Sequence, residues 1–177
     1  MRKTSILAAV ALSAFAGTMV ACNDDDEFTN IDITETFAAS LNSANEITVN
    51  PLVGGPTATG VAGLTLVNGV LTVVVDVNGP LTSGVIGAHI HGPATTTQNA
   101  AIVLDFTPSM AAVIAAGATG GQLVNVTIDL NTQLVDPTGV LRVSPAALVD
   151  MLRSGTAYIN VHTVLNPDGE IRGQVVP

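Results

Sequence analysis

The sequence has one cysteine, no tryptophan and almost no basic residues. Its 177 residues include five Lys or Arg against 14 Asp or Glu, and only 3% of the chain is aromatic. A single cysteine excludes a disulfide bond within the chain. So few cations cannot neutralise a run of phosphates, and we therefore expect no nucleic-acid partner. With so few aromatic side chains, the core must be built mainly from Val, Ile, Leu and Ala.

Motifs of several common enzyme classes are also missing. The sequence contains no Gly-x-Ser-x-Gly nucleophile elbow, no phosphate-binding glycine motif and no His-Glu-x-x-His pair. The acids Glu46, Asp105 and Asp129 stand alone in the sequence, and we expect each of them on a solvated face. No catalytic residue is assigned, which favours a binding module over an enzyme.

The N-terminus has the pattern of a lipoprotein signal. Arg2 and Lys3 precede an apolar run over residues 6–16, and small residues lead into Cys22. This order predicts a signal peptide over residues 1–21, whose apolar run is too short to span a bilayer. Cys22 then resembles the lipid-bearing cysteine of bacterial lipoproteins. The alternative is an ordinary secretory signal followed by an incidental thiol.

An acidic segment follows the cysteine at once. The run NDDDE, residues 23–27, cannot pack because its like charges repel, so residues 22–34 are expected to form a solvated tether. The run also resembles the surface-export signal of some bacterial lipoproteins. We expect membrane attachment through a lipid at Cys22, as an outer-membrane lipoprotein of a bacterial cell envelope, in either periplasmic or surface orientation.

Residues 35–177 are expected to form one all-β domain. Short apolar runs alternate with clusters of Gly, Pro, Asn and Thr, a spacing typical of β-sandwiches and barrels. In residues 124–130 apolar and polar residues alternate, which indicates a strand with one buried and one solvated face. The predicted fold class is a single antiparallel β-sandwich with Greek-key-like connections. The expected strands are residues 35–41, 59–67, 70–77, 85–91, 101–106, 123–130, 157–164 and 170–176.

One segment breaks the β pattern. Ser144 can cap a helix, Pro145 suits the first helical position and Gly155 can end the element. We predict one short helix over residues 145–154, lying over an edge or an end of the sandwich. Residues 110–116 fit either a helical turn or a loop.

Two of the three histidines lie on one predicted strand. On residues 85–91, His89 and His91 point to the same side, because side chains alternate along a strand. The opposite side is apolar and is the natural core face. We therefore expect the histidine pair to face outward, with Gly87 leaving open space beside it.

The third histidine, His162, lies on the predicted strand 157–164 and also faces away from the core. Two imidazoles at positions i and i+2, with one from another strand, match a three-ligand copper or zinc site with an open position. Ordered strands fix the directions of such ligands before an ion arrives. The alternative is that these are surface histidines whose hydrogen bonds tie loops together.

The residues that follow His162 determine which side chains lie beside it. The turn Asn-Pro-Asp-Gly at residues 166–169 allows two registers for the following strand, and the hydrophobic pattern favours a three-residue loop with a bulge. In that register His162 lies opposite Gln174, with Arg172 diagonal to it. Arg172, Gln174 and Asn160 are then candidates to support a site from the same face.

Three stretches of the sequence resemble a known family. AHIHGPA (88–94) and YINVHTVLNPDGEIRGQV (158–175) are similar to the two most distinctive motifs of the CHRD domain, the module named after chordin. FAASLNSANE (37–46) resembles the opening segment of that family, although the Val-Pro-Pro that usually follows is replaced. The resemblance covers residues 35–176 and implies an all-β sandwich that occurs in secreted proteins and lipoproteins.

A weaker likeness is to copper–zinc superoxide dismutases, which also place a His-x-His pair on a strand and a later histidine near the C-terminus. This sequence has only three histidines, so none is left to bridge two metals, and it has no paired cysteines. We therefore do not expect a dismutase of that type. A mononuclear copper site remains compatible with the sequence.

Our hypothesis from the sequence is a lipid-anchored, extracytoplasmic module that binds a metal ion through His89, His91 and His162. Copper is the favoured ion and zinc the alternative. The competing hypothesis is an interaction module for a protein or glycan partner in the envelope. A small copper redox enzyme is a third hypothesis.

Overall fold

The computed structural model describes residues 33–48, 51–132 and 140–177. The predicted signal peptide over residues 1–21, the lipidation site Cys22 and most of the acidic tether lie outside the described residues. Within the described ranges, no helix combines the length and apolar character needed to cross a membrane.

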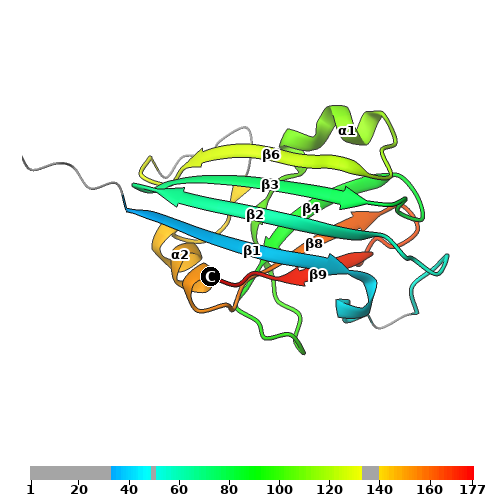
Figure 1. Cartoon of the computed structure of the whole chain (residues 1–177), viewed down its shortest axis with the longest axis horizontal. Helices are drawn as coiled ribbons and strands as arrows, with labels where there is room; N and C mark the ends of the chain where they lie inside the picture. Colours follow the sequence, from blue (N-terminus) through cyan, green and yellow to red (C-terminus); the bar gives the residue numbers. More distant parts are fainter. Residues whose placement is uncertain (1–32, 49–50, 133–139) are drawn as a thin grey trace, which may run out of the picture. The chain divides into compact units, whose positions relative to one another are not determined.

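The described residues form one antiparallel sheet of nine strands in the order β6-β3-β2-β1-β9-β8-β4-β5-β7 (Figure 1). All eight predicted strands are present, and the structure adds the two-residue strand β7. The strands are β1 (Thr34–Asn42), β2 (Thr59–Val67), β3 (Val70–Asn78), β4 (Val85–His91), β5 (Ile102–Asp105), β6 (Gly121–Asp129), β7 (Val140–Leu141), β8 (Tyr158–Thr163) and β9 (Ile171–Gln174).

Alternation of apolar and polar residues produces the long strands of one half of this sheet. Along β3 every second side chain from Leu71 to Val77 is buried, as expected for a strand with one core face. The turn between β2 and β3 is Asn68-Gly69, and both residues have positive φ, 49° and 83°. Such a two-residue turn matches the twist of the flanking strands, which pair from Val67 and Val70 onward.

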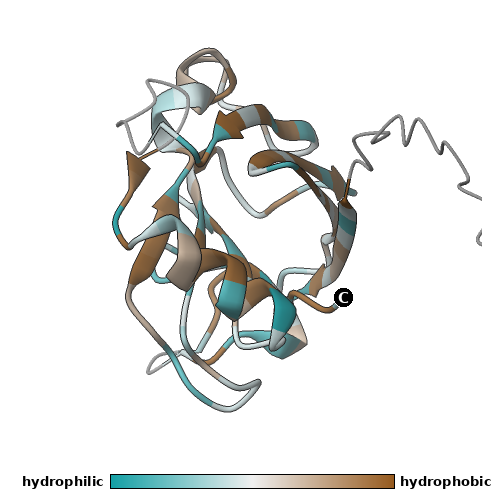
Figure 2. Ribbon diagram, turned by 90° about the vertical axis from the view of Figure 1, so that its left-hand side faces the viewer, coloured by the Kyte–Doolittle hydropathy of each residue, from teal (hydrophilic) through white to brown (hydrophobic). Residues whose placement is uncertain are grey.

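The sheet curls so that its two halves enclose one core, which confirms an all-β, sandwich-like fold. Figure 2 shows the curl, with apolar segments on both halves, and the buried apolar residues of both halves form a single cluster. The seam between the halves is narrow. Strands β1 and β9 pair only at Asn42 and Arg172, and an isolated bridge joins Ala38 to Val176.

The predicted helix is confirmed as α2 (Pro145–Arg153). The Ser144 side chain accepts a hydrogen bond from the backbone N–H of Ala147 at 3.2 Å, and Gly155 follows with φ +66°. Leu148 and Leu152 face the core and are fully buried. The ambiguous segment 110–116 is helical: a 3-10 turn, Thr107–Met110, leads into the short helix α1 (Ala111–Ala115). A further 3-10 turn, Ser43–Asn45, follows β1.

The predicted register of the last two strands is wrong. Strand β8 pairs Val161 with Ile171, Asn160 with Arg172 and Tyr158 with Gln174, so Gln174 does not lie opposite His162. The two strands are joined by a wider loop than either predicted register allows.

A buried carboxylate is the physical reason for the wider loop. Glu170 is fully buried, and its Oε2 atom accepts hydrogen bonds from Thr163 Oγ1 at 2.6 Å and Asn166 Nδ2 at 3.1 Å. Thr82 donates to the same carboxylate from its backbone N–H at 2.7 Å. The loop must therefore turn inward to satisfy this group. The predicted turn within it is present, with Gly169 N–H donating to Asn166 O at 3.1 Å.

Candidate metal centre

The three histidines lie on one face of the half-sheet β5-β4-β8-β9, on the side away from the apolar core. Cross-strand pairing sets their positions: His89 lies opposite Asn160, His91 opposite Tyr158, and Gly87 opposite His162. Paired residues of an antiparallel ladder point to the same side, about 5 Å apart. The sheet therefore brings all three imidazoles together before any loop is considered.

The histidines are buried, which corrects the expectation that they face solvent. His91 and His162 are each 9% exposed, and the side chain of His89 is 14% exposed. The space beside Gly87 is not open either. A Cβ atom added there would lie 2.8 Å from Thr107 Oγ1. Alternation along the strands shows which face is not the core, but it cannot show that loops cover that face.

His91 is fixed by a backbone carbonyl and by a ring. Its Nδ1 atom lies 2.9 Å from Ala100 O. A carbonyl only accepts hydrogen bonds, so Nδ1 carries the proton and Nε2 carries the lone pair. The ring stacks on Tyr158 with centroids 4.8 Å apart and an interplanar angle of 5°. The Nε2 atom of His91 is buried, and no described residue gives it a hydrogen bond.

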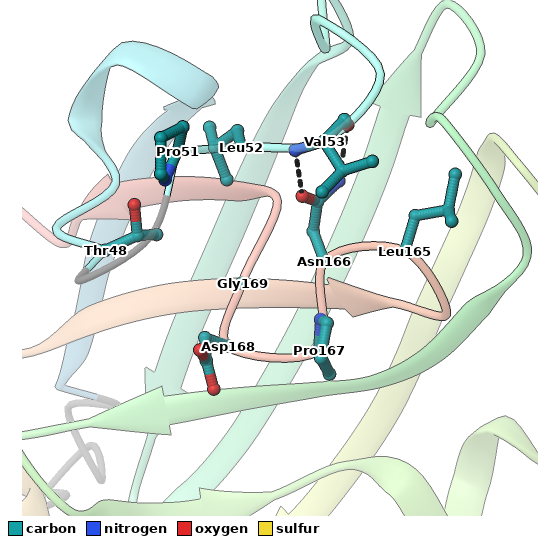
Figure 3. Close-up of a pocket in the computed structure, with 9 residues that line it drawn as sticks. All are labelled: Thr48, Pro51, Leu52, Val53, Leu165, Asn166, Pro167, Asp168 and Gly169. Atoms are coloured by element: carbon teal, nitrogen blue, oxygen red, sulfur yellow. Dashed lines mark hydrogen bonds between the residues drawn. The ribbon is translucent and has the colours of Figure 1, made fainter.

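His162 is oriented in the same way by the loop that follows it. Its Nδ1 atom lies 2.9 Å from Pro167 O, so Nδ1 is the donor and Nε2 carries the lone pair. The loop itself is anchored to a neighbouring segment (Figure 3). Asn166 accepts from Val53 N–H at 2.8 Å and donates to Val53 O at 3.1 Å.

His89 is contacted at its other ring nitrogen, Nε2. Its Nε2 atom lies 3.3 Å from Asp105 Oδ1 and 3.3 Å from Thr107 Oγ1. The carboxylate favours a proton on Nε2, which leaves the lone pair on Nδ1. Nδ1 lies 3.0 Å from Nε2 of His162. In this tautomer the two lone pairs repel each other unless a cation lies between them, whereas in the other tautomer Nδ1 of His89 donates a hydrogen bond to His162.

One ring nitrogen from each histidine lies within 4.8 Å of the others, without any further Cys, Asp or Glu ligand in the cluster among the described residues. Two nitrogens bound to the same zinc ion lie roughly 3.3 Å apart in a tetrahedral site. Small rotations of the rings therefore close this triangle around an ion. In each ring, the nitrogen that does not point into the cluster faces an oxygen that can accept a hydrogen bond. This arrangement is typical of metal-binding histidines.

Electrostatics favour the neutral form of all three rings. Burial lowers the pKa of His89 to about 4, and the neighbouring His162 acts in the same direction. Burial also lowers the pKa of His91 to about 4. The pKa of His162 is lowered by burial as well, against the opposing effect of its bond to Pro167. Near neutral pH the cluster therefore presents three uncharged imidazoles, the form that binds metals.

Arg172 pairs with Asn160 and is therefore diagonal to His162, as predicted. Its guanidinium lies over Tyr158, with the Cζ atom 3.4 Å from the ring centroid. It donates hydrogen bonds to Asn99 Oδ1, Thr95 O and Gln98 O. Arg172 thus holds the loop that carries the Ala100 carbonyl. Gln174 donates to Ala94 O and Gly155 O and serves the same loop from its other end.

Two acids expected on solvated faces belong to this surface instead. Asp105 contacts His89 and accepts from Arg142 at 2.8 Å. Although burial opposes it, the hydrogen bonds from Thr107 lower the pKa of Asp105. Glu46 accepts from Asn160 Nδ2. Sequence spacing carries no signal for either contact, because the partners are far apart in the chain. Asp129 is exposed, as expected.

A depression of about 310 Å³ opens beside the cluster. Its lining includes His91, Tyr158 and Asn160 from the strands, and Ala100 and Asp168 from the loops. Of the three histidines, His91 lines this depression.

The fold and the cluster define an all-β domain with a buried three-histidine centre on one face of its sheet. The chain belongs to the CHRD domain family, whose family model matches residues 37–175. The resemblance noted in the sequence motifs is therefore confirmed. No curated protein and no solved structure matches the chain.

Proposed function

We propose that this domain binds one metal ion, with copper favoured, through Nδ1 of His89 and Nε2 of His91 and His162. One observation carries the proposal. Ala100 O and Pro167 O each accept the hydrogen of one ring nitrogen, which leaves a lone pair on Nε2 of His91 and on Nε2 of His162. A proton on Nε2 of His89, toward Asp105, directs a third lone pair from Nδ1 to His162 Nε2, 3.0 Å away. Such an arrangement costs free energy without a cation and is stabilised by one.

The donor set supports copper over zinc. Three neutral imidazoles suit both ions, but divalent copper binds nitrogen donors more strongly than zinc does.

We further propose that the domain works as a binding or sequestering module in the bacterial envelope. The proposal includes an outer-membrane lipoprotein, attached by a lipid at Cys22. An apolar h-region ahead of Cys22 and the acidic run behind it support this placement.

Copper titration tests the proposed function. The chain should carry Cys22→Ser, because a thiol would itself capture copper. Calorimetry, or mass spectrometry under native conditions, should show one Cu²⁺ bound per chain. His89→Ala, His91→Ala and His162→Ala should each lower the affinity by a large and similar factor, because each removes one of three nitrogen ligands. Binding that survives the loss of His162 would contradict this ligand set.

A further inference from the structure

We propose that Asn160 supplies the fourth ligand of the metal ion through its Oδ1 atom. This inference rests on the proposed function. Asn160 lies opposite His89 in the β4–β8 ladder and diagonal to His91, and it precedes His162 by two positions on the same face. On a pleated sheet such positions are all neighbours. Asn160 is thus adjacent to each of the three proposed ligands.

The amide of Asn160 is held in one orientation. Its Nδ2 atom donates to both carboxylate oxygens of Glu46, at 2.8 and 3.0 Å. When Glu46 is ionised it accepts and does not donate, so this contact places the amide nitrogen toward Glu46. The Oδ1 atom is therefore directed away from Glu46.

The freed oxygen has no donor to satisfy it. Asn160 is 4% exposed, and its Oδ1 atom receives no hydrogen bond from the described residues, like Nε2 of His91. Both residues line the same depression. Two buried acceptors cannot bond to each other, and a buried acceptor without a partner costs free energy. One cation shared between them satisfies both atoms.

The turn after β8 is shaped to leave room for this amide. A Cβ atom added at Gly169 would lie 2.6 Å from Asn160 Nδ2 and 2.8 Å from Glu46 Oε2. Gly169 also has φ +132°, a conformation that other residues rarely adopt. The same turn supplies Pro167 O to His162. One loop therefore positions a nitrogen ligand and the proposed oxygen ligand together.

An amide oxygen beside three imidazoles gives a donor set of three nitrogens and one oxygen. Nitrogen and oxygen donors in a tetragonal arrangement suit Cu²⁺. The Glu46 carboxylate, by accepting from the amide N–H, makes the amide oxygen more electron-rich and a better donor. Glu46 is thereby a positioning residue that acts through Asn160.

Two variants in the Cys22→Ser chain test this inference. Asn160→Leu keeps the side-chain size but removes the oxygen. Glu46→Gln combined with Asn160→Asp reverses the hydrogen bond, because the introduced amide donates to one oxygen of the introduced carboxylate and leaves the other oxygen free. Copper affinity is measured by competition with a chelator, and electron paramagnetic resonance of the Cu²⁺ form reports the ligand set. Circular dichroism checks that each variant folds.

We expect Asn160→Leu to lower copper affinity by about 10- to 100-fold. The double variant should bind at least as tightly as the parent chain, with a changed resonance spectrum, because its oxygen ligand is anionic. A double variant with the parent spectrum, or Asn160→Leu with the parent affinity, would overturn the inference while leaving the histidine site intact. A parent chain that binds no copper would overturn the proposed function and this inference together.

Discussion

At the residue scale, what defines the site is which nitrogen of each ring is free. The sequence nominates His89, His91 and His162 by their place on strands, but it cannot give their tautomers. Those depend on the carbonyl oxygens of Ala100 and Pro167, which belong to loops. Any residue type provides a backbone carbonyl, so no sequence pattern marks these two acceptors.

Glu46 gives a test of the electrostatics around Asn160. Burial raises the pKa of Glu46 to about 7, although the Asn160 hydrogen bond and the Arg172 charge oppose it. An acid with a raised folded-state pKa favours folding below its unfolded pKa of 4.5, and this contribution is lost as pH rises to about 7. Glu46→Gln cannot ionise. The free energy of unfolding of Glu46→Gln, relative to that of the parent chain, should therefore rise by about 1–2 kcal/mol from pH 5 to pH 8.

Urea unfolding of the metal-free Glu46→Gln and parent chains at both pH values measures this gain. Comparing the two chains subtracts the titration of the histidines, which both share. Equal stability differences at pH 5 and pH 8 would show that Glu46 has an ordinary pKa in the fold.

At the element scale, the strands could be predicted from the sequence, but the loops that connect and cover them could not. Alternation located all eight of the longer strands and capping residues located α2, because both patterns are local in sequence. The β8–β9 register failed because Glu170 draws the connecting loop inward. The burial of the histidine face was missed because it depends on the loop held by Arg172, whose partners lie more than 70 residues away in the chain.

Arg172 should matter for both stability and metal binding. It is 1% exposed, and Arg172→Met should destabilise the fold by roughly 3 kcal/mol, because it removes charged hydrogen bonds to buried acceptors. Copper affinity should fall as well, since the Ala100 carbonyl loses its support. Arg153→Met is the matched control. The side chain of Arg153 is 54% exposed in its pair with Glu35, which does not contact the histidines, so its loss should change stability and copper affinity little.

Chemical unfolding and the copper competition assay measure these two variants. Equal effects of Arg172→Met and Arg153→Met on copper affinity would mean that the loop from residue 94 to residue 100 does not position His91.

At the scale of the whole molecule, the site belongs to one half of the curled sheet. Strands β5, β4, β8 and β9 carry it, and the other half meets them at a narrow seam. Both halves supply the core, but among the described residues only the short-stranded half carries the three-histidine cluster.

The proposed lipid anchor is tested on the complete chain in a bacterial host. Cys22→Ser should leave an unprocessed precursor or release the protein from the membrane fraction, because the thiol is the lipid attachment point. Fractionation followed by immunoblotting measures this. A variant that fractionates and migrates like the parent chain would exclude lipidation at Cys22.

The claim that three lone pairs converge is tested most directly by nitrogen NMR of the histidine rings. Long-range proton–nitrogen spectra of the Cys22→Ser chain distinguish the tautomers, and one equivalent of Zn²⁺ is a diamagnetic probe for the same ligands. We predict Nδ1–H for His91 and His162 and Nε2–H for His89 in the metal-free protein. Zinc should then shift Nδ1 of His89 and Nε2 of the other two. Opposite tautomers, or three rings unchanged by zinc, would contradict the proposed metal centre.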